Sequence, residues 1–357
     1  MTVKRPRHDV KFSLLYRTAE KAGRRGITCE CVSSVIELPA SPSRSATTVG
    51  WFPALSSGVV WVCLRSRTPV SSRRSVLVKR PTASSDNIWG VATGVLPWHL
   101  SDGELRELAS EIAPPGTTEP LGAYLFGPGE RGALLARRLE FDVFNEAFGD
   151  PPEMVEAELG AYEDSSLFIL VTDHLRGLPA GVMRLIVPSP TGLKSLNDLS
   201  KVWGVPAGDA IERTGIALDP LNTWDVSGMA IARDYRGRAM QGLVGMGLYQ
   251  TLARAALWCD VGWFVAVFDL PVFRLVRWKL GLIFAGFKGL TARPYMGSAA
   301  SIPAWCDVLE AERRLAAADP QLHQILCLGT GLDPALRPAD LSAAQCLSER
   351  GPQAAAS

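Results

Sequence analysis

The sequence has few of the residues that build metal centres or disulfide frameworks. Its 357 residues include seven cysteines and four histidines. The cysteines are scattered and odd in number. Only Cys29 and Cys31 lie close together, in a CxC spacing that is not typical of zinc sites. The histidines are far apart and form no ligand pattern. We therefore expect a protein of a reducing compartment, without a metal site or a disulfide scaffold.

Long apolar runs are also missing. The longest apolar stretch, residues 261–290, is interrupted by Asp269, Arg274, Arg277 and Lys279. These charges make the stretch unlike a membrane span. The basic N-terminus is not followed by the apolar core of about 7–15 residues that a secretory signal needs. The sequence therefore predicts a cytoplasmic protein with no membrane span.

Charge is distributed unevenly, although the net charge is only +1. Residues 1–100 carry 15 Lys and Arg against 5 Asp and Glu, whereas the rest of the chain carries 22 against 31. Ser, Arg, Thr and Pro dominate the first hundred residues, which predicts a low-complexity basic extension without a core of its own. It is either a disordered arm that contacts anionic partners or the product of a mis-annotated start. Nucleic-acid binding is disfavoured, because the extension lacks interleaved aromatic residues and any DNA-binding motif.

Regular structure is expected from residue 101 onwards. Ser101 and Glu104 have the spacing of a capping box before a short helix. Residues 116–132 are rich in loop-forming residues, and the Ala-, Pro- and Ser-rich segment 333–357 predicts a loose tail. Periodicity predicts helices at 131–148, 196–218 (interrupted near 204–206), 271–279 and 307–318. It predicts strands at 166–172, 180–187, 224–231, 262–268 and 282–287, the first two forming an antiparallel hairpin. The order predicts one α/β (α+β) domain over 101–332, with helices on the faces of a mixed sheet.

The most informative segment runs from Trp224 to Tyr249, as a strand, a basic loop and a helix that begins near Met240. Alternation predicts that one strand face carries Asp225, Ser227, Met229 and Ile231. The loop brings together Gly237 and the arginines Arg233, Arg236 and Arg238. A helix N-terminus has unpaired N–H groups and a positive dipole end, so this arrangement is typical of a phosphate site. The alternative is a solvated basic loop.

Four segments, in matching order and spacing, resemble a known family. They are RRLEFDVFNEAFG (137–149), AGVMRLIVPS (180–189), WDVSGMAIARDYRG (224–237) and FRLVRWKLGLIFAGFKGLTARPYMGSAASIPAW (273–305). With these segments the chain resembles the GNAT-fold acyltransferases, and more narrowly their autoinducer-synthase-like branch. That branch comprises acyl-homoserine-lactone synthases and long-chain N-acyl amino acid synthases. The resemblance covers about half of the chain, from residue 134 to residue 309.

The resemblance implies a fold and a reaction. It implies a mostly antiparallel central sheet flanked by helices. It also implies an enzyme that moves an acyl group from an acyl thioester to an amine acceptor, such as an amino acid or a derivative. The co-substrate would be acyl-CoA or the acyl-phosphopantetheine of an acyl carrier protein, and no cofactor would be bound permanently. The alternative is a non-catalytic GNAT-fold module that binds an acyl thioester or a protein.

The resemblance also implies roles for individual residues. The residues expected to bind the co-substrate are Met229, Ile231, Arg233, Arg236, Gly237, Arg238, Ala239 and Gly242. The residues expected to be catalytic are Asp225, Ser227 and Arg184. A structural role stays open for two of them: Asp225 could stabilise the start of its strand, and Arg184 could pair with Asp225 or Glu140.

Departures from the family pattern favour the non-catalytic alternative. A family arginine falls on Glu140 and another on Gly228, while a phosphate-loop glycine falls on Gln241. The stretch 271–280 holds Phe273 and Trp278 but no tyrosine to protonate a thiolate. The aromatic residues between 263 and 287 are expected mainly in the core, with two or three of them lining an acyl channel.

Overall fold

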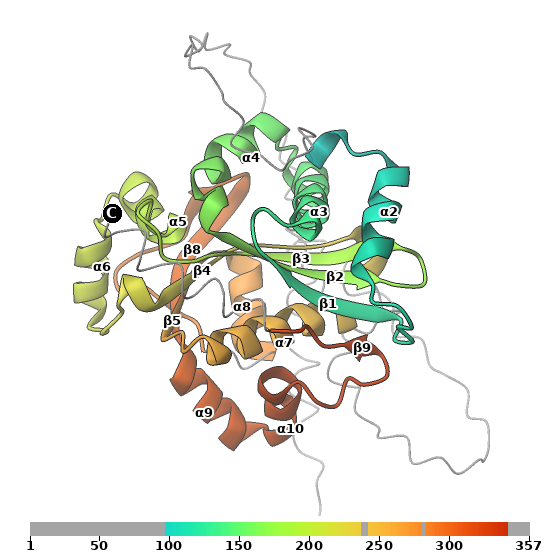
Figure 1. Ribbon diagram of the computed structural model, residues 1–357. Coiled ribbons are helices and arrows are strands. Elements are labelled where there is room, and N and C mark those ends of the chain that lie inside the picture. The colour runs from blue at the N-terminus through green and yellow to red at the C-terminus, as the bar shows by residue number, and fades with distance from the viewer. Residues whose placement is uncertain (1–96, 237–241, 280–282, 342–357) are drawn as a thin grey trace, which may run out of the picture. The chain divides into compact units, whose positions relative to one another are not determined.

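The computed structural model describes residues 97–236, 242–279 and 283–341 (Figure 1). The basic extension predicted for residues 1–100 lies almost entirely outside these ranges, as does the end of the predicted tail. The residues between 236 and 242 also lie outside them. The predicted site residues Gly237, Arg238 and Ala239 are among those residues.

Nine strands of the described residues form one sheet with the order β6-β8-β5-β4-β3-β2-β1-β9, and β7 pairs with β8. The strands are β1 Leu121–Phe126, β2 Ser166–Asp173, β3 Leu178–Ile186, β4 Thr223–Ile231, β5 Trp263–Asp269, β6 Ala285–Gly286, β7 Arg293–Tyr295, β8 Ser298–Asp307 and β9 Leu336–Arg337. Neighbouring strands pair antiparallel, except that β4 pairs with β5, and β1 with β9, in parallel. The predicted fold class, a mixed and mostly antiparallel sheet with helices on its faces, is confirmed.

Helices cover both faces of this sheet (Figure 1). They are α2 Asp102–Ile112, α3 Arg131–Phe148, α4 Pro152–Leu159, α5 Lys194–Asp198, α6 Ala207–Thr214, α7 Leu243–Trp258, α8 Leu270–Lys279, α9 Val308–Ala318 and α10 Pro320–His323. Helices α2 and α3 share a hydrophobic core with one face, and α7 shares a core with the other. Helix α7 is buried along most of its length, which explains why it is apolar on nearly all sides.

Elements with strong local signals are confirmed. Ser101 and Glu104 form the predicted capping box at the start of α2. Helix α3 spans the predicted residues 131–148 and ends on Gly149, whose positive φ of 74° is the common helix C-terminal conformation of glycine. Strands β2 and β3 form the predicted antiparallel hairpin.

Elements that depend on distant pairing were predicted less well. The segment expected to be a loop, 116–132, contains β1, which lies between β2 and β9. The expected tail contributes β9, which pairs with β1 from the far end of the domain. The strand expected at 282–287 is reduced to two residues, and the helix expected from Met240 begins at Leu243. Short strands such as β1 and β9 are stabilised by their neighbours in the sheet, so local pattern alone does not reveal them.

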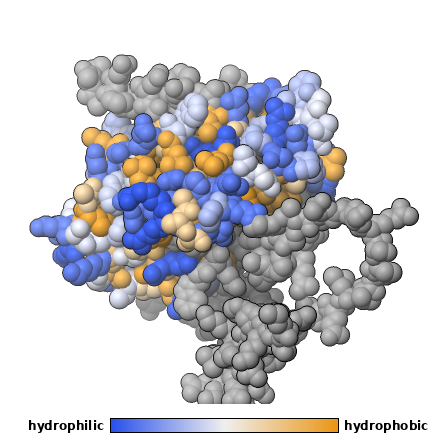
Figure 2. Space-filling model, turned by 90° about the horizontal axis from the view of Figure 1, so that it is seen from below, coloured by the Kyte–Doolittle hydropathy of each residue, from blue (hydrophilic) through white to orange (hydrophobic). Residues whose placement is uncertain are grey.

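The surface seen from below in Figure 1 carries hydrophobic side chains in small patches among hydrophilic ones (Figure 2). Exposed large hydrophobic side chains lie on different elements, for example Trp258 on α7 and Leu309 on α9. Single exposed apolar side chains are common on soluble proteins and do not define an interface. No helix in the described ranges combines the length and the apolar composition that crossing a bilayer requires.

Candidate functional site

The centre of the sheet opens where β4 and β5 part. These parallel strands pair at only three positions, from Thr223 with Trp263 to Asp225 with Val265. Strand β4 continues to Ile231 and β5 to Asp269 without further pairing between them. The β4 backbone beyond Asp225 therefore has one edge that no neighbouring strand covers.

A β-bulge lies where the strands begin to part. On β3, Arg184 is opposite Gly228 and the next residue, Leu185, is opposite Val226, so Ser227 is an extra residue on β4. A bulge reverses the alternation of side chains beyond it.

The bulge overturns the predicted common face of Asp225, Met229 and Ile231. Asp225 pairs with Ile186, which belongs to the core around α5 and α6, whereas Met229 pairs with Met183, which belongs to the core around α7. Simple alternation along the sequence predicts one face because it does not count the inserted residue.

The backbone N–H groups of Met229 and Ile231 point into the gap between β4 and β5. The Ala232 N–H donates to the Ala180 carbonyl across the β3–β4 ladder, at 2.9 Å. Bonded and non-bonded pairs alternate in an antiparallel ladder, so Ala230 also bonds to β3, while Met229 and Ile231 face away from it. The Ile231 carbonyl, on the open edge, accepts a hydrogen bond of 2.6 Å from Nε of Arg236.

A cavity of about 150 Å³ occupies this gap and reaches helices on both faces of the sheet. Its lining is mainly apolar and includes Phe144 and Phe148 of α3 and Leu252 of α7. Phe268 and Phe284 also line it, and both pack in or against the hydrophobic core. The polar residues that line it are Asp150, Ser227, Tyr249, Asp269, Tyr295, Ser298 and Ser301. Of the residues predicted to be catalytic, Ser227 lies in this cavity.

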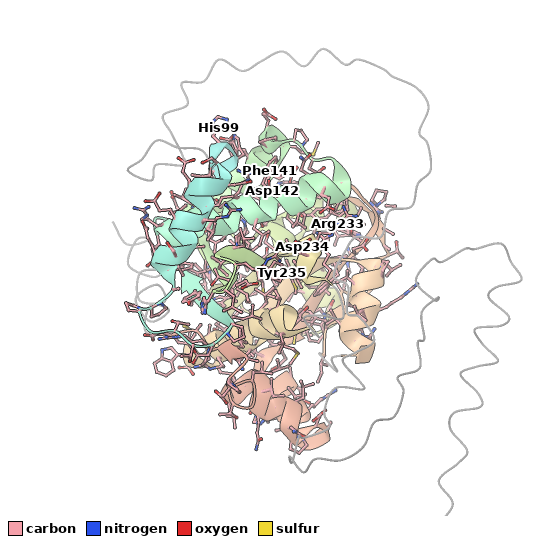
Figure 3. The ribbon with its side chains drawn as sticks, turned by 90° about the vertical axis from the view of Figure 1, so that its right-hand side faces the viewer. His99, Phe141, Asp142, Arg233, Asp234 and Tyr235 are labelled. Atoms are coloured by element: carbon pink, nitrogen blue, oxygen red, sulfur yellow. The ribbon has the colours of Figure 1, made fainter. Side chains whose placement is uncertain are left out.

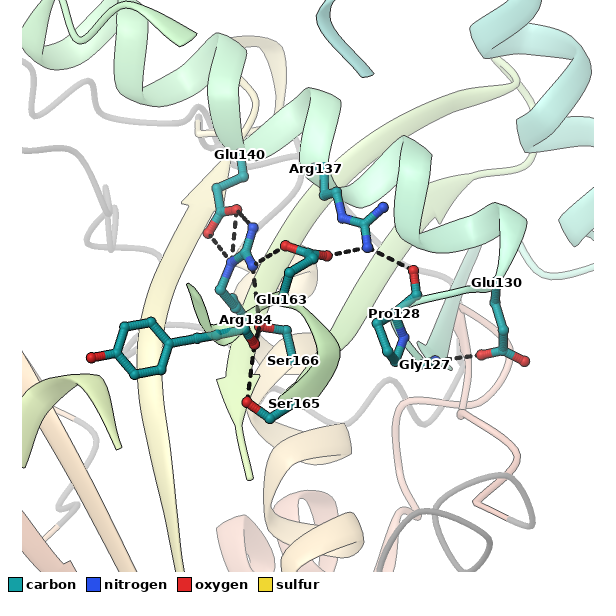
Figure 4. Close-up of polar contacts among 10 residues, drawn as sticks. Gly127, Pro128, Glu130, Arg137, Glu140, Glu163, Ser165, Ser166 and Arg184 are labelled. Carbon is teal, nitrogen blue, oxygen red and sulfur yellow. Dashed lines mark hydrogen bonds and ion pairs between the residues drawn. The ribbon is translucent and has the colours of Figure 1, made fainter. Parts of the chain in front are cut away.

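Arg184 lies outside the cavity, fully buried in an ion-pair network against α3 (Figure 4). Its guanidinium donates to Glu140 through Nε at 3.0 Å and through Nη2 at 2.6 Å. Its Nη1 donates to Glu163 at 2.9 Å and to Ser166 at 3.1 Å. The guanidinium also stacks over the ring of Phe168, 4.5 Å from the ring centroid. Burial alone would lower the pKa of Arg184, but the two carboxylates raise it above its ordinary value.

A second arginine completes this network. Arg137, also buried, pairs with Glu163 and donates to the Pro128 carbonyl at 2.6 Å. Two buried carboxylates and two buried guanidinium groups thus balance one another. The arrangement contains the pair between Arg184 and Glu140 that the sequence left open as a structural role; Glu163 as a further partner was not foreseen.

Because Gly228 has no side chain, it leaves room for Glu140 in this network. A Cβ at this position would lie 2.7 Å from Oε1 of Glu140. We expect Gly228→Ala to lower the free energy of unfolding by roughly 1–3 kcal/mol, because it pushes a buried carboxylate away from Arg184. Gly208 is a matched control, since it is exposed in α6 with nothing near its missing Cβ. Gly208→Ala should stabilise by about 0.5–1 kcal/mol. Urea unfolding of both variants tests the opposite signs.

Asp225 is also fully buried and is not among the residues that line the cavity. Its carboxylate accepts hydrogen bonds from the backbone N–H of Ser195 at 2.5 Å and from the Ser195 hydroxyl at 2.7 Å. It therefore links β4 to the first turn of α5. Burial raises the pKa of Asp225 to about 7, against the opposing effects of Ser195 and Lys194, and Asp198 raises it further.

This raised pKa predicts a pH dependence of stability. The unfolded chain ionises Asp225 at roughly pH 3.9. Between that pH and about 7 the folded protein holds one more proton at this residue, so the free energy of unfolding falls as the pH rises. The loss is complete above about pH 7. Urea unfolding from pH 4 to 8 should show this decline, and Asp225→Asn, which mimics the protonated acid, should flatten it. An unchanged slope in the variant would contradict the assignment.

Two of the predicted phosphate-binding arginines follow β4. Arg233 belongs to a short 3₁₀ turn, Arg233–Tyr235, which lies beneath α3 in Figure 3. Its side chain is 81% exposed and lies 3.7 Å from Glu146, whereas that of Arg236 is 11% exposed. Gly242, with φ of 76°, precedes the first turn of α7. Arg236 supports the open edge of β4, and Arg233 remains accessible beside Glu146 of α3.

The comparisons with known proteins give distant structural likenesses. No protein-family model matches the chain, and no curated protein matches it. BjaI, a CoA-dependent acyl-homoserine lactone synthase solved with SAM and isopentyl-CoA, is 15% identical with a TM-score of 0.42, covering 64% of this chain and 98% of that chain. FeeM, an N-acyl amino acid synthase from uncultured soil microbes, is 16% identical with a TM-score of 0.39, covering 54% and 93%.

A third similar structure is MesI, also a CoA-dependent acyl-homoserine lactone synthase. It is 15% identical with a TM-score of 0.34, covering 55% of this chain and 96% of that chain. These proteins belong to the two classes that the four sequence segments resemble. At such identities and TM-scores the likeness is distant.

Proposed function

We propose that this protein is an N-acyltransferase that moves an acyl group from an acyl thioester to an amine acceptor. The observation that carries the proposal is the parting of β4 from β5 beside a mainly apolar cavity. The open edge there offers backbone N–H donors that the sheet does not use. Transfer from a thioester needs such a donor for the oxyanion, together with an apolar place for the acyl chain.

In the proposed reaction the thioester carbonyl lies in the gap, where the Met229 N–H donates to its oxygen. The acyl chain extends along the apolar lining. A neutral amine attacks the carbonyl carbon, a C–N bond forms and the C=O pair moves to oxygen. When this pair returns, the C–S bond breaks and the thiolate leaves with its electrons. The surplus proton on nitrogen passes to the thiolate, so an amide and a free thiol result.

The phosphates of the donor would be bound by groups outside the cavity. Arg233 is accessible, and the first turn of α7, further along the chain, carries N–H groups and a positive dipole end. We assign Arg233, with the sequence-predicted residues Gly237, Arg238, Ala239 and Gly242, to the pyrophosphate of CoA or the phosphopantetheine of a carrier protein. Asp225 and Arg184 are given positioning roles, since both lie buried beside the cavity rather than in it.

The test is a direct assay of transfer. Purified protein is incubated with acyl-CoA of several chain lengths and a pooled amino-acid mixture, while thiol release and products are followed by mass spectrometry. An N-acyl product establishes the reaction and names both substrates. Acyl carrier protein donors are assayed in the same way. If no donor releases thiol while one acyl thioester raises the Tm, the non-catalytic binding module replaces the enzyme.

A further inference from the structure

Asp150 occupies a rigid corner between two helices. Helix α3 ends at Phe148, and Gly149 turns the chain with φ of 74° while its N–H donates to the Asn145 carbonyl. Pro151 precedes α4, and Pro152 is its first residue. A left-handed glycine on one side and two prolines on the other restrict the backbone on both sides of Asp150. The position of its side chain is therefore fixed by local chemistry.

Asp150 has no partner for its charge in the described part of the chain. The residue is 7% exposed and lines the cavity between β4 and β5. Every other carboxylate that is buried among the described residues accepts from a donor. Glu140 and Glu163 accept from Arg184, Asp198 from Lys194, Asp225 from Ser195, and Asp173 from Tyr235. Buried carboxylates normally have such donors. The Asp150 carboxylate lines the cavity and has no protein donor, so a ligand that enters the cavity can supply one.

The surroundings specify what kind of donor fits. Burial raises the pKa of Asp150, and no charged side chain of the described residues opposes the shift. Phe144, Phe148 and Leu159 also line the cavity. Its other titratable groups are Asp269, which accepts from Ser298, Tyr295, which donates to Asp198, and Tyr249, whose pKa is raised by burial. A cationic group attached to an apolar body would satisfy both the carboxylate and the lining.

We propose that Asp150 binds the protonated amino group of the acceptor and takes up its proton before acyl transfer. This inference rests on the proposed function and names the acceptor as a primary ammonium compound. The N–H bond breaks, the proton goes to the Asp150 carboxylate, and the electron pair stays on nitrogen to attack the thioester carbon. Asp150 then returns the proton to solvent.

The first test compares Asp150→Asn with Asp164→Asn, a matched control at an exposed carboxylate outside the cavity. Because burial raises the pKa of Asp150, ionising it opposes folding, so Asp150→Asn should have a Tm a few degrees above wild type at pH 8. The difference should shrink as the pH is lowered towards 4, because the raised pKa of Asp150 favours its protonated form there. If the Tm of Asp150→Asn were below that of wild type at both pH values, Asp150 would have a structural partner within the protein, and the proposal would be overturned.

The second test measures acyl transfer. Asp150→Asn should lower kcat/KM for the amine about 100-fold or more and abolish the acidic limb of its pH profile, while Asp164→Asn should match wild type. A wild-type limb that persists in Asp150→Asn would overturn the proposal.

A third measurement separates this inference from the proposed function, since it needs no catalysis. The probe n-hexylamine, cationic at pH 8, should raise the Tm of wild type and of Asp164→Asn but not of Asp150→Asn. Its neutral counterpart n-hexanol should affect all three alike. If wild type acylates no amine yet this pattern appears, the acyltransferase proposal fails and the ammonium site stands. An equal n-hexylamine effect in Asp150→Asn overturns the site.

Discussion

Replacing Arg184 by methionine is expected to lower the free energy of unfolding by about 3–5 kcal/mol. The change removes the guanidinium from Glu140 and Glu163, which are both buried and would be left as uncompensated charges with only Arg137 nearby. For a domain of this size the loss corresponds to a decrease in Tm of roughly 10 °C. Differential scanning calorimetry and urea unfolding measure it.

Arg138→Met is the matched control. Arg138 lies on α3, as Glu140 does, and pairs with Asp142 four residues later, where the side chains are 19% and 45% exposed. It also donates to the Leu100 carbonyl. Partly exposed helix pairs of this kind contribute about 0.3–0.5 kcal/mol, so the control should unfold almost like wild type. If Arg184→Met instead kept the wild-type Tm and lost only acceptor binding, the guanidinium would belong to the substrate site after all.

The same network shows how far the sequence can predict this site. Arg184 lies with Val182 and Ile186 on one face of β3, as strand geometry implies, and a buried arginine requires carboxylates. Glu140 could be named as a partner from the sequence because it lies in the segment 137–149, one of the four that resemble the family. Glu163 was not, since it lies on a short 3₁₀ helix whose packing no periodicity encodes.

The gap between β4 and β5 could not be predicted from the sequence either. Nothing in the sequence from Trp224 to Ile231 marks Ser227 as an inserted residue, because a bulge depends on the register with the partner strand. Ser227, which was predicted to be catalytic, lines the cavity, whereas Asp225 lies on the opposite face from Met229, with which it was expected to share a face. Asp150 lies just after the helix predicted over 131–148, and the sequence assigns it no role. The sequence marks Asp150 only by its place between a glycine and two prolines. That its carboxylate is buried without a protein partner can be learned only from the structure.

Replacing the Met229 amide by an ester is expected to lower kcat by about 10²–10³-fold. Incorporating the α-hydroxy acid of methionine at this position removes the backbone N–H but keeps the side chain. This N–H faces the gap rather than β3, so its loss should remove the proposed donor to the oxyanion and leave the β3–β4 ladder bonded. Single-turnover acyl transfer and the Tm are measured on the same preparation.

The ester at Ala230 is the opposite case. Its N–H belongs to the ladder, so the ester should lower the free energy of unfolding by about 1 kcal/mol and leave kcat near that of wild type. Each ester also weakens the carbonyl that precedes it, so the comparison between the two variants is decisive. Equal loss of kcat in both would assign the oxyanion to another donor. If only the Met229 ester lost activity and only the Ala230 ester lost stability, the separation of β4 from β5 would serve to leave the Met229 N–H free for the reaction.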